Sequence, residues 1–251
     1  MEFKIVIPAR YASVRLPGKP LLEINGKPML QHVYERARES SAREVVIATD
    51  DGRIADAASA FGAPLCMTSE AHRSGTDRIA EVVEQLGWAK NTIVVNLQGD
   101  EPSMPAALID QVAADMAEHE AAGVATLSAP IRQRRQLFDP HVVKVVTDVN
   151  GYALYFSRAP IPWHRDEFLD DDAPLPVTAE FARHIGLYAY RAGYLQQFVA
   201  WEPAPIERAE SLEQLRVLWH GGRIHVSRAC QEPGQGVDTE ADLRQVARLL
   251  A

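Results

Sequence analysis

FKIVIPARYASVRLPGKPLLEINGKPML, residues 3–30, is the stretch that decides the fold. Its apolar run from Phe3 to Ile7 is typical of a strand buried on both faces of a parallel sheet. The proline that follows ends the strand, because proline has no N–H to donate to a neighbouring strand. Arg10, Arg15 and Lys19 come next, among small residues. We expect them on a loop at the carboxyl end of this strand, the edge at which open α/β sheets bind ligands.

Three cations on such a loop predict a cradle for a triphosphate. Their spacing matches neither the G-x-x-x-x-G-K-[ST] loop of P-loop enzymes nor the G-x-G-x-x-G turn of dinucleotide binders. We therefore expect the phosphates to meet side-chain cations as well as backbone amides. A basic loop that is only solvated is the alternative, and the position of the loop at the ligand-binding edge argues against it.

The first half of the chain alternates apolar runs with stretches of helical periodicity, which predicts a mostly parallel sheet with helices on both faces. Beyond the first strand we expect strands at 45–49, 63–67 and 92–97, and helices at 54–61, 77–86 and 105–118. The pattern changes after Val124. Asn150-Gly151 between two β-type runs, 142–147 and 152–157, predicts a hairpin. Beyond the hairpin we expect a strand at 185–190, a helix at 205–219, a strand at 224–227 and a helix at 239–250.

Composition limits the class of protein. The chain has 251 residues, 47% hydrophobic, with a formal net charge of −8 and two cysteines. The negative charge argues against general nucleic-acid binding, which needs a basic surface. It also means that an anionic substrate needs a local basic patch. With no leader-like start and no apolar run near the roughly 20 residues that span a bilayer, we expect a cytoplasmic protein without membrane insertion and with reduced thiols.

Two carboxylates stand where a metal ion would be useful. Asp100 follows the strand at 92–97 directly, facing the basic loop, and Asp238 lies in the glycine-rich segment 233–239. Carboxylates and phosphate oxygens are ligands that Mg²⁺ prefers. Asp100 could instead be a turn residue. Asp238 could equally be only the N-cap of the last helix.

Other polar residues give weaker signals. Ser74-Gly75-Thr76-Asp77-Arg78 opens a helix, and a helix N-terminus attracts anions, although Ser74 or Thr76 serving as a cap is the simpler interpretation. Solvent exposure explains Glu213 and Gln214 on the helix at 205–219, and His184 has the pattern of a structural histidine. We interpret three tryptophans as core residues: Trp163, Trp201 and Trp219.

Several of these segments together resemble the 3-deoxy-manno-octulosonate (Kdo) cytidylyltransferases, also called CMP-Kdo synthetases. The resemblance covers nearly the whole chain and is far more specific than any one motif. Small departures are Asp77 in place of an expected Glu, and Gln235 in a loop that more often carries Thr. The segments that carry it are IPARYASVRLPGKPL (7–21), INGKPM (24–29), ATD (48–50), SGTDR (74–78), NLQGDEP (96–102), VKVV (143–146), GYALYFSRA (151–159), LEQLRVLW (212–219) and PGQGVDT (233–239).

The resemblance implies a nucleotide-diphospho-sugar transferase-like fold in a single domain, 1–251. A nucleotide-binding core would comprise 1–123 and 220–251, and 124–219 would form a smaller mixed, β-rich sugar-binding and dimerisation part. It also implies a homodimer, Mg²⁺ dependence, and activation of Kdo with CTP to give CMP-Kdo and pyrophosphate for lipopolysaccharide synthesis.

The same resemblance assigns roles to residues by motif. Lys19, Asp100 and Arg15 would be catalytic, and Asp100 and Asp238 would hold Mg²⁺. The nucleotide and its phosphates would contact Ala9, Arg10, Arg15, Lys19, Ser74, Gly75 and Arg78. The sugar acid would contact Gln98, Arg158, His184, Tyr188, Glu213 and Gln214, with Arg158 as a partner for its carboxylate because a guanidinium pairs both oxygens.

Three other functions stay open on the sequence. The first is a cytidylyltransferase for another acidic sugar, such as an amino-Kdo or a sialic-type acid. The second is a metal-dependent glycosyltransferase, against which the basic first loop and the lack of a D-x-D partner for Asp100 both argue. The third is a nucleotide-binding regulator without activity, which the presence of both metal-type carboxylates disfavours.

Overall fold

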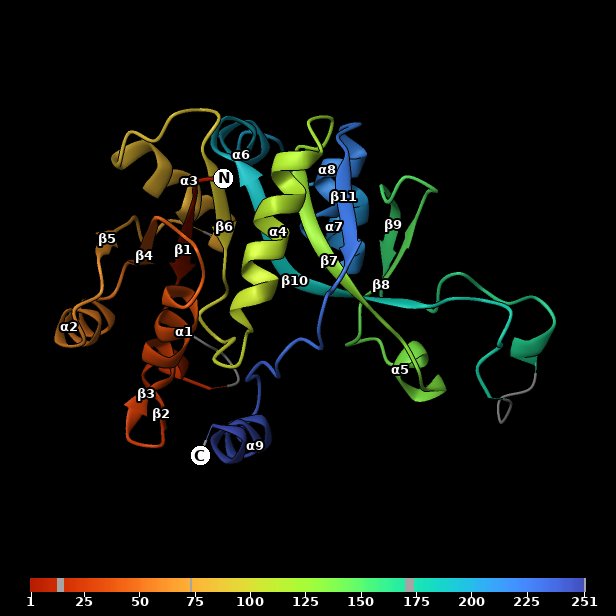
Figure 1. The fold of residues 1–251 in the computed structure, drawn as a ribbon, viewed down its shortest axis with the longest axis horizontal. Coiled ribbons are helices and arrows are strands. Elements are labelled where there is room, and N and C mark those ends of the chain that lie inside the picture. Colours follow the sequence, from red (N-terminus) through yellow and green to blue (C-terminus); the bar gives the residue numbers. More distant parts are fainter. Residues whose placement is uncertain (13–15, 73, 170–173, 251) are drawn as a thin grey trace.

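The chain folds around a nine-stranded sheet (Figure 1). The computed structural model describes residues 1–12, 16–72, 74–169 and 174–250. Seven strands follow one another in the order β11-β7-β10-β6-β1-β4-β5. Their bounds are β1 Phe3–Pro8, β4 Glu44–Thr49, β5 Leu65–Met67, β6 Ile93–Asn96, β7 Val124–Pro130, β10 Ala182–Arg191 and β11 Ile224–Arg228.

The sheet is mostly parallel, as the sequence predicts. β1 lies between β4 and β6 and is parallel to both, with Ile5 opposite Val45 on one side and Val95 on the other. β4 is parallel to β5, and β7 to β11. β10 is antiparallel to both of its neighbours, β6 and β7. The two parallel groups are therefore joined through one reversed strand.

Helices cover both faces of the sheet, which accounts for its near-continuous apolar strands. One face packs against α1 (Met29–Arg38), α2 (Gly52–Ala60) and α4 (Ala106–Glu118). The other packs against α3 (Gly75–Gln85), α6 (Ala192–Val199) and α8 (Leu215–Trp219). None of the described helices combines the length and the apolar character needed to cross a membrane.

The predicted hairpin is present as β8 (Lys144–Thr147) and β9 (Ala153–Ser157), which pair antiparallel. Asp148 shapes its turn, because its Oδ1 accepts the N–H groups of Asn150 (2.8 Å) and Tyr152 (2.9 Å). Gly151 adopts φ +81°, a left-handed conformation that favours glycine. β8 also pairs with β10, so the hairpin is attached to the central sheet.

Several expectations of local structure are wrong. The helix expected at 205–219 is two helices, α7 (Pro205–Glu210) and α8, because Ser211 between them has φ +50°. Trp163 and Trp219 are 56% and 54% exposed rather than core residues. Elements that the sequence patterns did not indicate are α1, β7, α6 and the small elements β2 (Glu23–Ile24), β3 (Lys27–Pro28) and α5 (Arg134–Phe138). The closing helix is present as α9 (Glu240–Leu249).

A buried lysine fixes the hairpin to the segments around it. Lys144 is fully buried, and its Nζ donates to the carbonyl oxygens of Asp139 (2.9 Å), Val142 (2.6 Å) and Arg158 (2.5 Å). Burial lowers the pKa of this ammonium. Its three acceptors offset the cost of removing the charge from water.

We expect Lys144→Met to lower the free energy of unfolding by about 3 kcal/mol, because three buried carbonyl oxygens lose their donor. Chemical denaturation followed by circular dichroism measures this change. Lys27→Met is the matched control: its ammonium pairs with Glu35 at an exposed site, where a loss below about 1 kcal/mol is expected. Equal losses in the two variants would contradict the role given to Lys144.

Candidate active site

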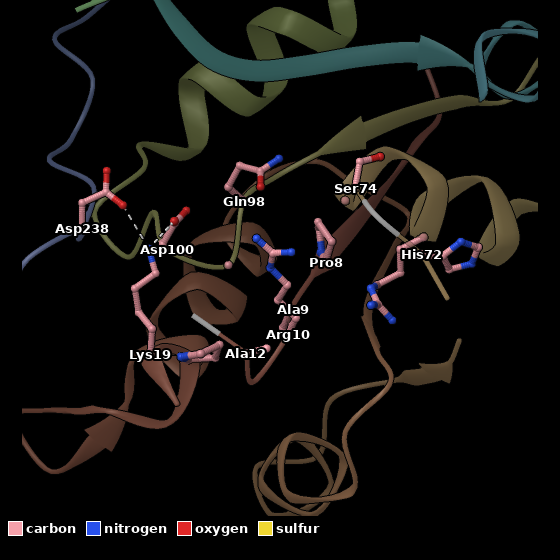
Figure 2. Close-up of a pocket in the computed structure, with 14 residues that line it drawn as sticks. Pro8, Ala9, Arg10, Ala12, Lys19, His72, Ser74, Gln98, Asp100 and Asp238 are labelled. Atoms are coloured by element: carbon pink, nitrogen blue, oxygen red, sulfur yellow. Dashed lines mark hydrogen bonds and ion pairs between the residues drawn. The ribbon is translucent and has the colours of Figure 1, made fainter. Parts of the chain in front are cut away.

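An open pocket of about 420 Å³ lies at the carboxyl ends of β1 and β6, the sheet edge that the sequence predicts (Figure 2). It is bounded by the loop after β1, the turn after β6, the start of α3 and the loop before α9. Its lining residues are Pro8, Ala9, Arg10, Ala12, Lys19, Pro20, His72, Ser74, Gly75, Arg78, Gln98, Gly99, Asp100 and Asp238.

Lys19 joins three of these segments. It begins a short 3-10 helix, Lys19–Leu21, and its Nζ donates to Asp100 Oδ2 at 2.6 Å and to Asp238 Oδ1 at 3.2 Å (Figure 2). The same ammonium donates to the carbonyl oxygen of Val237 at 2.9 Å. Two carboxylates from distant parts of the chain thus share one cation. The N-cap of α9 is Thr239, so the capping alternative for Asp238 is wrong.

The glycine-rich loop is pressed onto the turn after β6, which places Asp238 beside Asp100. The N–H of Val237 donates to the carbonyl oxygen of Asp100 at 2.9 Å. A Cβ on Gly234 would lie 2.1 Å from the carbonyl oxygen of Ser103, and one on Gly236 would lie 2.8 Å from a carboxylate oxygen of Glu101. These glycines are therefore required by the close approach of the two segments.

The donors at this point fit Mg²⁺. Asp100 and Asp238 already converge on a cation, the Lys19 ammonium, and Glu101 contributes a third carboxyl close by. Burial, together with the charges of Asp100 and Asp238, raises the pKa of Glu101 to about 8. Asp100 and Asp238 both line the pocket and offer carboxylate oxygens, the donors that a hard divalent ion prefers.

Two of the three cations predicted to bind the phosphates lie in the pocket lining. Arg10 and Lys19 line the pocket together with Ala9. Arg15 lies outside the described residues, so its role stays a prediction. Gly99 also lines the pocket, and a Cβ there would make a tight contact of 3.0 Å with the carbonyl oxygen of Pro8. The close approach is thus to the neighbouring strand.

The start of α3 forms the opposite wall of the pocket. Ser74 caps the helix: its Oγ accepts the N–H of Asp77 at 3.1 Å, and its own N–H donates to Asp77 Oδ2 at 3.2 Å. Gly75 lies beside it in the pocket lining. Arg78 reaches the lining too, but its buried guanidinium is held by Asp50 at 2.6 Å and by Thr68. Its ion pair ties α3 to the segment after β4.

The residues predicted to contact the sugar acid, here called the sugar set, begin at the pocket and lead away from it. Gln98 lines the pocket and donates to Asn96 Oδ1 at 2.8 Å. Tyr188 pairs with Asn96 across β10 and β6. The Tyr188 ring lies 5.2 Å from the ring of His184, whose Nε2 is 3.0 Å from Thr126 Oγ1. Gln98, Tyr188 and His184 are therefore contiguous.

The interpretation of Glu213 and Gln214 as solvent-exposed residues is wrong. Gln214 is 7% exposed. Glu213 Oε2 accepts a hydrogen bond from Thr76 in α3, next to the pocket residue Gly75. Burial raises the pKa of the Glu213 carboxyl, opposed by its hydrogen bonds to Thr76 and Ser74. Both residues lie in the turn between Ser211 and α8, and Glu213 faces the start of α3.

Arg158 follows β9 and is not among the pocket-lining residues. Its Nε donates to the carbonyl oxygen of Glu210 at 2.6 Å and its Nη1 to that of Pro140 at 2.9 Å. Glu210 also accepts the backbone N–H of Arg158. Two residues earlier, the Phe156 ring lies 5.1 Å from that of His184. Arg158 is thus held in a fixed orientation near the far end of the sugar set.

Sequence patterns indicated no role for Glu101 or Tyr190, and for Thr76 they indicated only a cap, a role that Ser74 fills. Glu101 follows Asp100, and a pair of adjacent carboxyl residues at a strand end is a signal that could have identified it. Tyr190 is buried on β10 and bonds to Thr76 and Asn96, which links the pocket wall to the sugar set. No sequence pattern marks these contacts of Thr76 and Tyr190, because their partners come from other elements.

His184 is enclosed by Phe156, Tyr188 and Thr126, and burial lowers its pKa to about 3. Its imidazole is therefore neutral at physiological pH. Because the folded pKa lies below the unfolded value of about 6.5, this group's contribution to stability is complete above pH 6.5. It is lost as the pH falls from 6.5 toward 3.

We expect His184→Gln to flatten this pH dependence. Between pH 7.5 and pH 5 the wild-type chain should lose up to about 2 kcal/mol more unfolding free energy than the variant. Urea denaturation at a series of pH values measures the difference. His141→Gln, at an exposed histidine, should follow the wild-type curve. Parallel curves for wild type and His184→Gln would contradict the burial argument.

Comparison with known proteins agrees with this geometry. A family model described as Cytidylyltransferase matches residues 4–224. The 3-deoxy-manno-octulosonate cytidylyltransferase of Idiomarina loihiensis is 57% identical over 249 residues, which cover 99% of this chain and 98% of the relative. That of Pseudomonas syringae pv. tomato is 59% identical over 248 residues, with the same coverage.

Solved structures are similar along the whole chain as well. A CMP:2-keto-3-deoxy-manno-octonic acid synthetase complexed with CTP matches with a TM-score of 0.90 and 44% identity, over 99% of this chain and 98% of that chain. A 4-diphosphocytidyl-2C-methyl-D-erythritol synthase matches with a TM-score of 0.63 and 14% identity over 100% of both chains. The second likeness shows that the fold is shared.

Proposed function

This chain belongs to the family of 3-deoxy-manno-octulosonate cytidylyltransferases, and we propose that it joins Kdo to CTP, giving CMP-Kdo and pyrophosphate for lipopolysaccharide synthesis. The observation that carries the proposal is Lys19 held between Asp100 and Asp238 at the edge of the pocket. Full-length identity of 57–59% to relatives of that name supports the substrate pair.

The nucleotide occupies the pocket. Arg10, Arg15 and Lys19 bind the triphosphate, and Ala9 and the segment Ser74–Arg78 hold the rest of the nucleotide. With a net charge of −8 the chain as a whole repels CTP, so these local cations are essential for binding. Arg78 acts in this scheme through its ion pair with Asp50, which positions α3 beside the nucleotide.

The sugar acid lies along the contiguous set that begins at Gln98. Tyr188 and neutral His184 offer hydrogen bonds to its hydroxyl groups. Glu213 and Gln214 approach it from the turn before α8, and Arg158 pairs with its carboxylate. We divide the chain by proposed role into a nucleotide core (1–123 and 220–251) and a sugar-binding part (124–219). The two parts are not separate folding units, because β7 and β10 of the sugar-binding part belong to the central sheet.

Asp100 and Asp238 would hold Mg²⁺, which when bound would supply positive charge to offset that of the phosphates and of the leaving pyrophosphate. The protein's own part is alignment and charge. Lys19 and the loop arginines offset the repulsion between an anionic sugar and an anionic triphosphate. The anomeric hydroxyl can then attack the α-phosphorus in line, and pyrophosphate leaves. We assign no side chain as general base.

Pyrophosphate release in the presence of Mg²⁺ tests the function. CTP is paired with Kdo, 8-amino-Kdo or N-acetylneuraminate, and UTP, ATP and GTP replace CTP as controls. We expect rapid release only with CTP and Kdo. Release with another sugar acid would keep the reaction class and change the substrate. No release with any pair, although CTP binds, would instead indicate a regulator.

We expect Asp100→Asn to lower kcat by about 100-fold or more, because the loss of one carboxylate weakens the site proposed for Mg²⁺, whose charge would offset that of the phosphates. Steady-state kinetics with CTP and Kdo measure the loss. Asp56→Asn, at an exposed residue of α2, is the matched control and should keep wild-type kcat. Wild-type turnover by Asp100→Asn would remove this residue from the reaction.

We also propose that the chain is a cytoplasmic homodimer with dimer contacts in the 124–219 part. Large apolar side chains exposed there support this: Trp163 is 56% exposed, and Val149, Leu154 and Val177 are also exposed. Sedimentation of the purified chain should give twice its mass of 27.8 kDa. A concentration-independent monomer would contradict the dimer without affecting the proposed reaction.

A further inference from the structure

Two histidines and an aspartate meet outside the pocket, where the C-terminal half of α4 packs against β11. Asp115 and His119 lie one turn apart on α4 and at its end, and His225 lies on β11 (elements in Figure 1). Their ligand atoms all lie within 4.8 Å of one another. None of the three is among the residues that line the pocket. The cluster is therefore separate from the site of the proposed reaction.

The contacts of His225 call for more positive charge than a neutral ring carries. Its Nδ1 is 2.8 Å from Asp115 Oδ2, and its Nε2 is 3.2 Å from the carbonyl oxygen of Asn150. Both partners are acceptors, whereas a neutral imidazole has one N–H. In a neutral ring one of these contacts lacks a proton, and a metal ion in place of the proton between Nδ1 and the carboxylate would leave the N–H free for Asn150. His225 is 6% exposed, so that charge would be held away from water.

His119 makes a second proton an unfavourable solution. Its ring is stacked on that of His225, with centroids 3.4 Å apart. Its Nδ1 also faces acceptors, the carbonyl oxygen of Asp115 at 2.9 Å and Asp115 Oδ1 at 3.3 Å. Charging both stacked rings would place two positive charges in contact. A metal ion shared by the two rings and the carboxylate satisfies all these groups with one proton on each ring.

We propose that Asp115, His119 and His225 bind a divalent ion of the zinc class. Imidazole nitrogens suit such borderline-soft ions. The Nε2–H of His225 would then donate to Asn150, the kind of backbone partner that metal-bound histidines use. Tetrahedral zinc, with bonds of about 2.1 Å, places its ligand atoms roughly 3.4 Å apart. To bring the ligand atoms from within 4.8 Å of one another to this distance, the His119 ring must turn out of its stack on His225.

His119 is able to make that movement. It is the C-terminal cap of α4, and its side chain is 30% exposed, whereas those of Asp115 and His225 are each 8% exposed. Tyr152 packs edge-on against both rings, 6.3 Å from His119 and 5.2 Å from His225. The exposed side of His119 leaves the fourth position to water.

The ion would hold three elements together. Asp115 and His119 come from α4, His225 comes from β11, and Asn150 belongs to the turn of the β8–β9 hairpin. Gly151 makes this approach possible, since a Cβ there would lie 2.7 Å from His225 Nε2. The site would thus fasten the hairpin to the nucleotide side of the molecule. It does not depend on the proposed reaction.

Metal titration of the whole chain tests the proposal. Millimolar Mg²⁺ first saturates the carboxylate site, and Cys230→Ser removes an exposed thiol. Co²⁺ is then added and followed by its visible absorption, and Zn²⁺ is added in competition. The variants are His119→Asn, His225→Asn and, as the matched control at an exposed histidine, His141→Asn.

We expect one equivalent of Co²⁺ per chain with tetrahedral absorption, displaced by Zn²⁺, in the parent and in His141→Asn. Affinity should fall about 100-fold in His119→Asn and His225→Asn. Zinc should raise the Tm of the parent but not that of His119→Asn. If His225→Asn fails to fold, His119→Asn decides. No stoichiometric uptake by the parent at micromolar metal, or uptake retained by His119→Asn, would overturn the proposal.

Discussion

The arrangement of the site depends on one ammonium group shared by two carboxylates. Lys19 belongs to the loop after β1, Asp100 to the turn after β6, and Asp238 to the loop before α9. Two like charges converge only where a cation compensates them, so Lys19 both closes the N- and C-terminal parts of the chain on each other and keeps two carboxylates in the pocket. Gly234 and Gly236 permit this approach because any side chain there would collide with the turn.

The reversed strand β10 connects the two halves of the site. It pairs with β6, which leads into the pocket, and with β7 and β8 on the other side. Tyr188 and His184 therefore extend from the pocket toward the hairpin along one strand. Lys144 and Arg158 continue the same line, because the Lys144 ammonium binds the backbone carbonyl of Arg158. A shift in the hairpin would displace the residues proposed to hold the sugar acid.

Sequence patterns predicted the parts of the structure that local chemistry determines. β1, β4 and β6 are runs of apolar residues, and the polar residues after them had to gather at one edge of a parallel sheet. Glu213 and Gln214 were misread because the pattern at 205–219 resembles one amphipathic helix, whereas Ser211 in a left-handed conformation divides it. Burial of Glu213 depends on Thr76, which is far away in sequence. No local pattern contains that information.

The pocket and the sugar set differ in how many of their side chains are charged. Around the pocket, charges are paired directly, as Lys19 is with Asp100 and Asp238 and Arg78 is with Asp50. In the sugar set, burial keeps His184 neutral and raises the pKa of Glu213, so that part favours hydrogen bonds between neutral groups. A sugar acid that binds there brings its own carboxylate and needs a cation that is already in place. Arg158 is the residue proposed for this role, and because its guanidinium is already oriented by the carbonyl oxygens of Glu210 and Pro140, pairing would not carry the cost of ordering a free side chain.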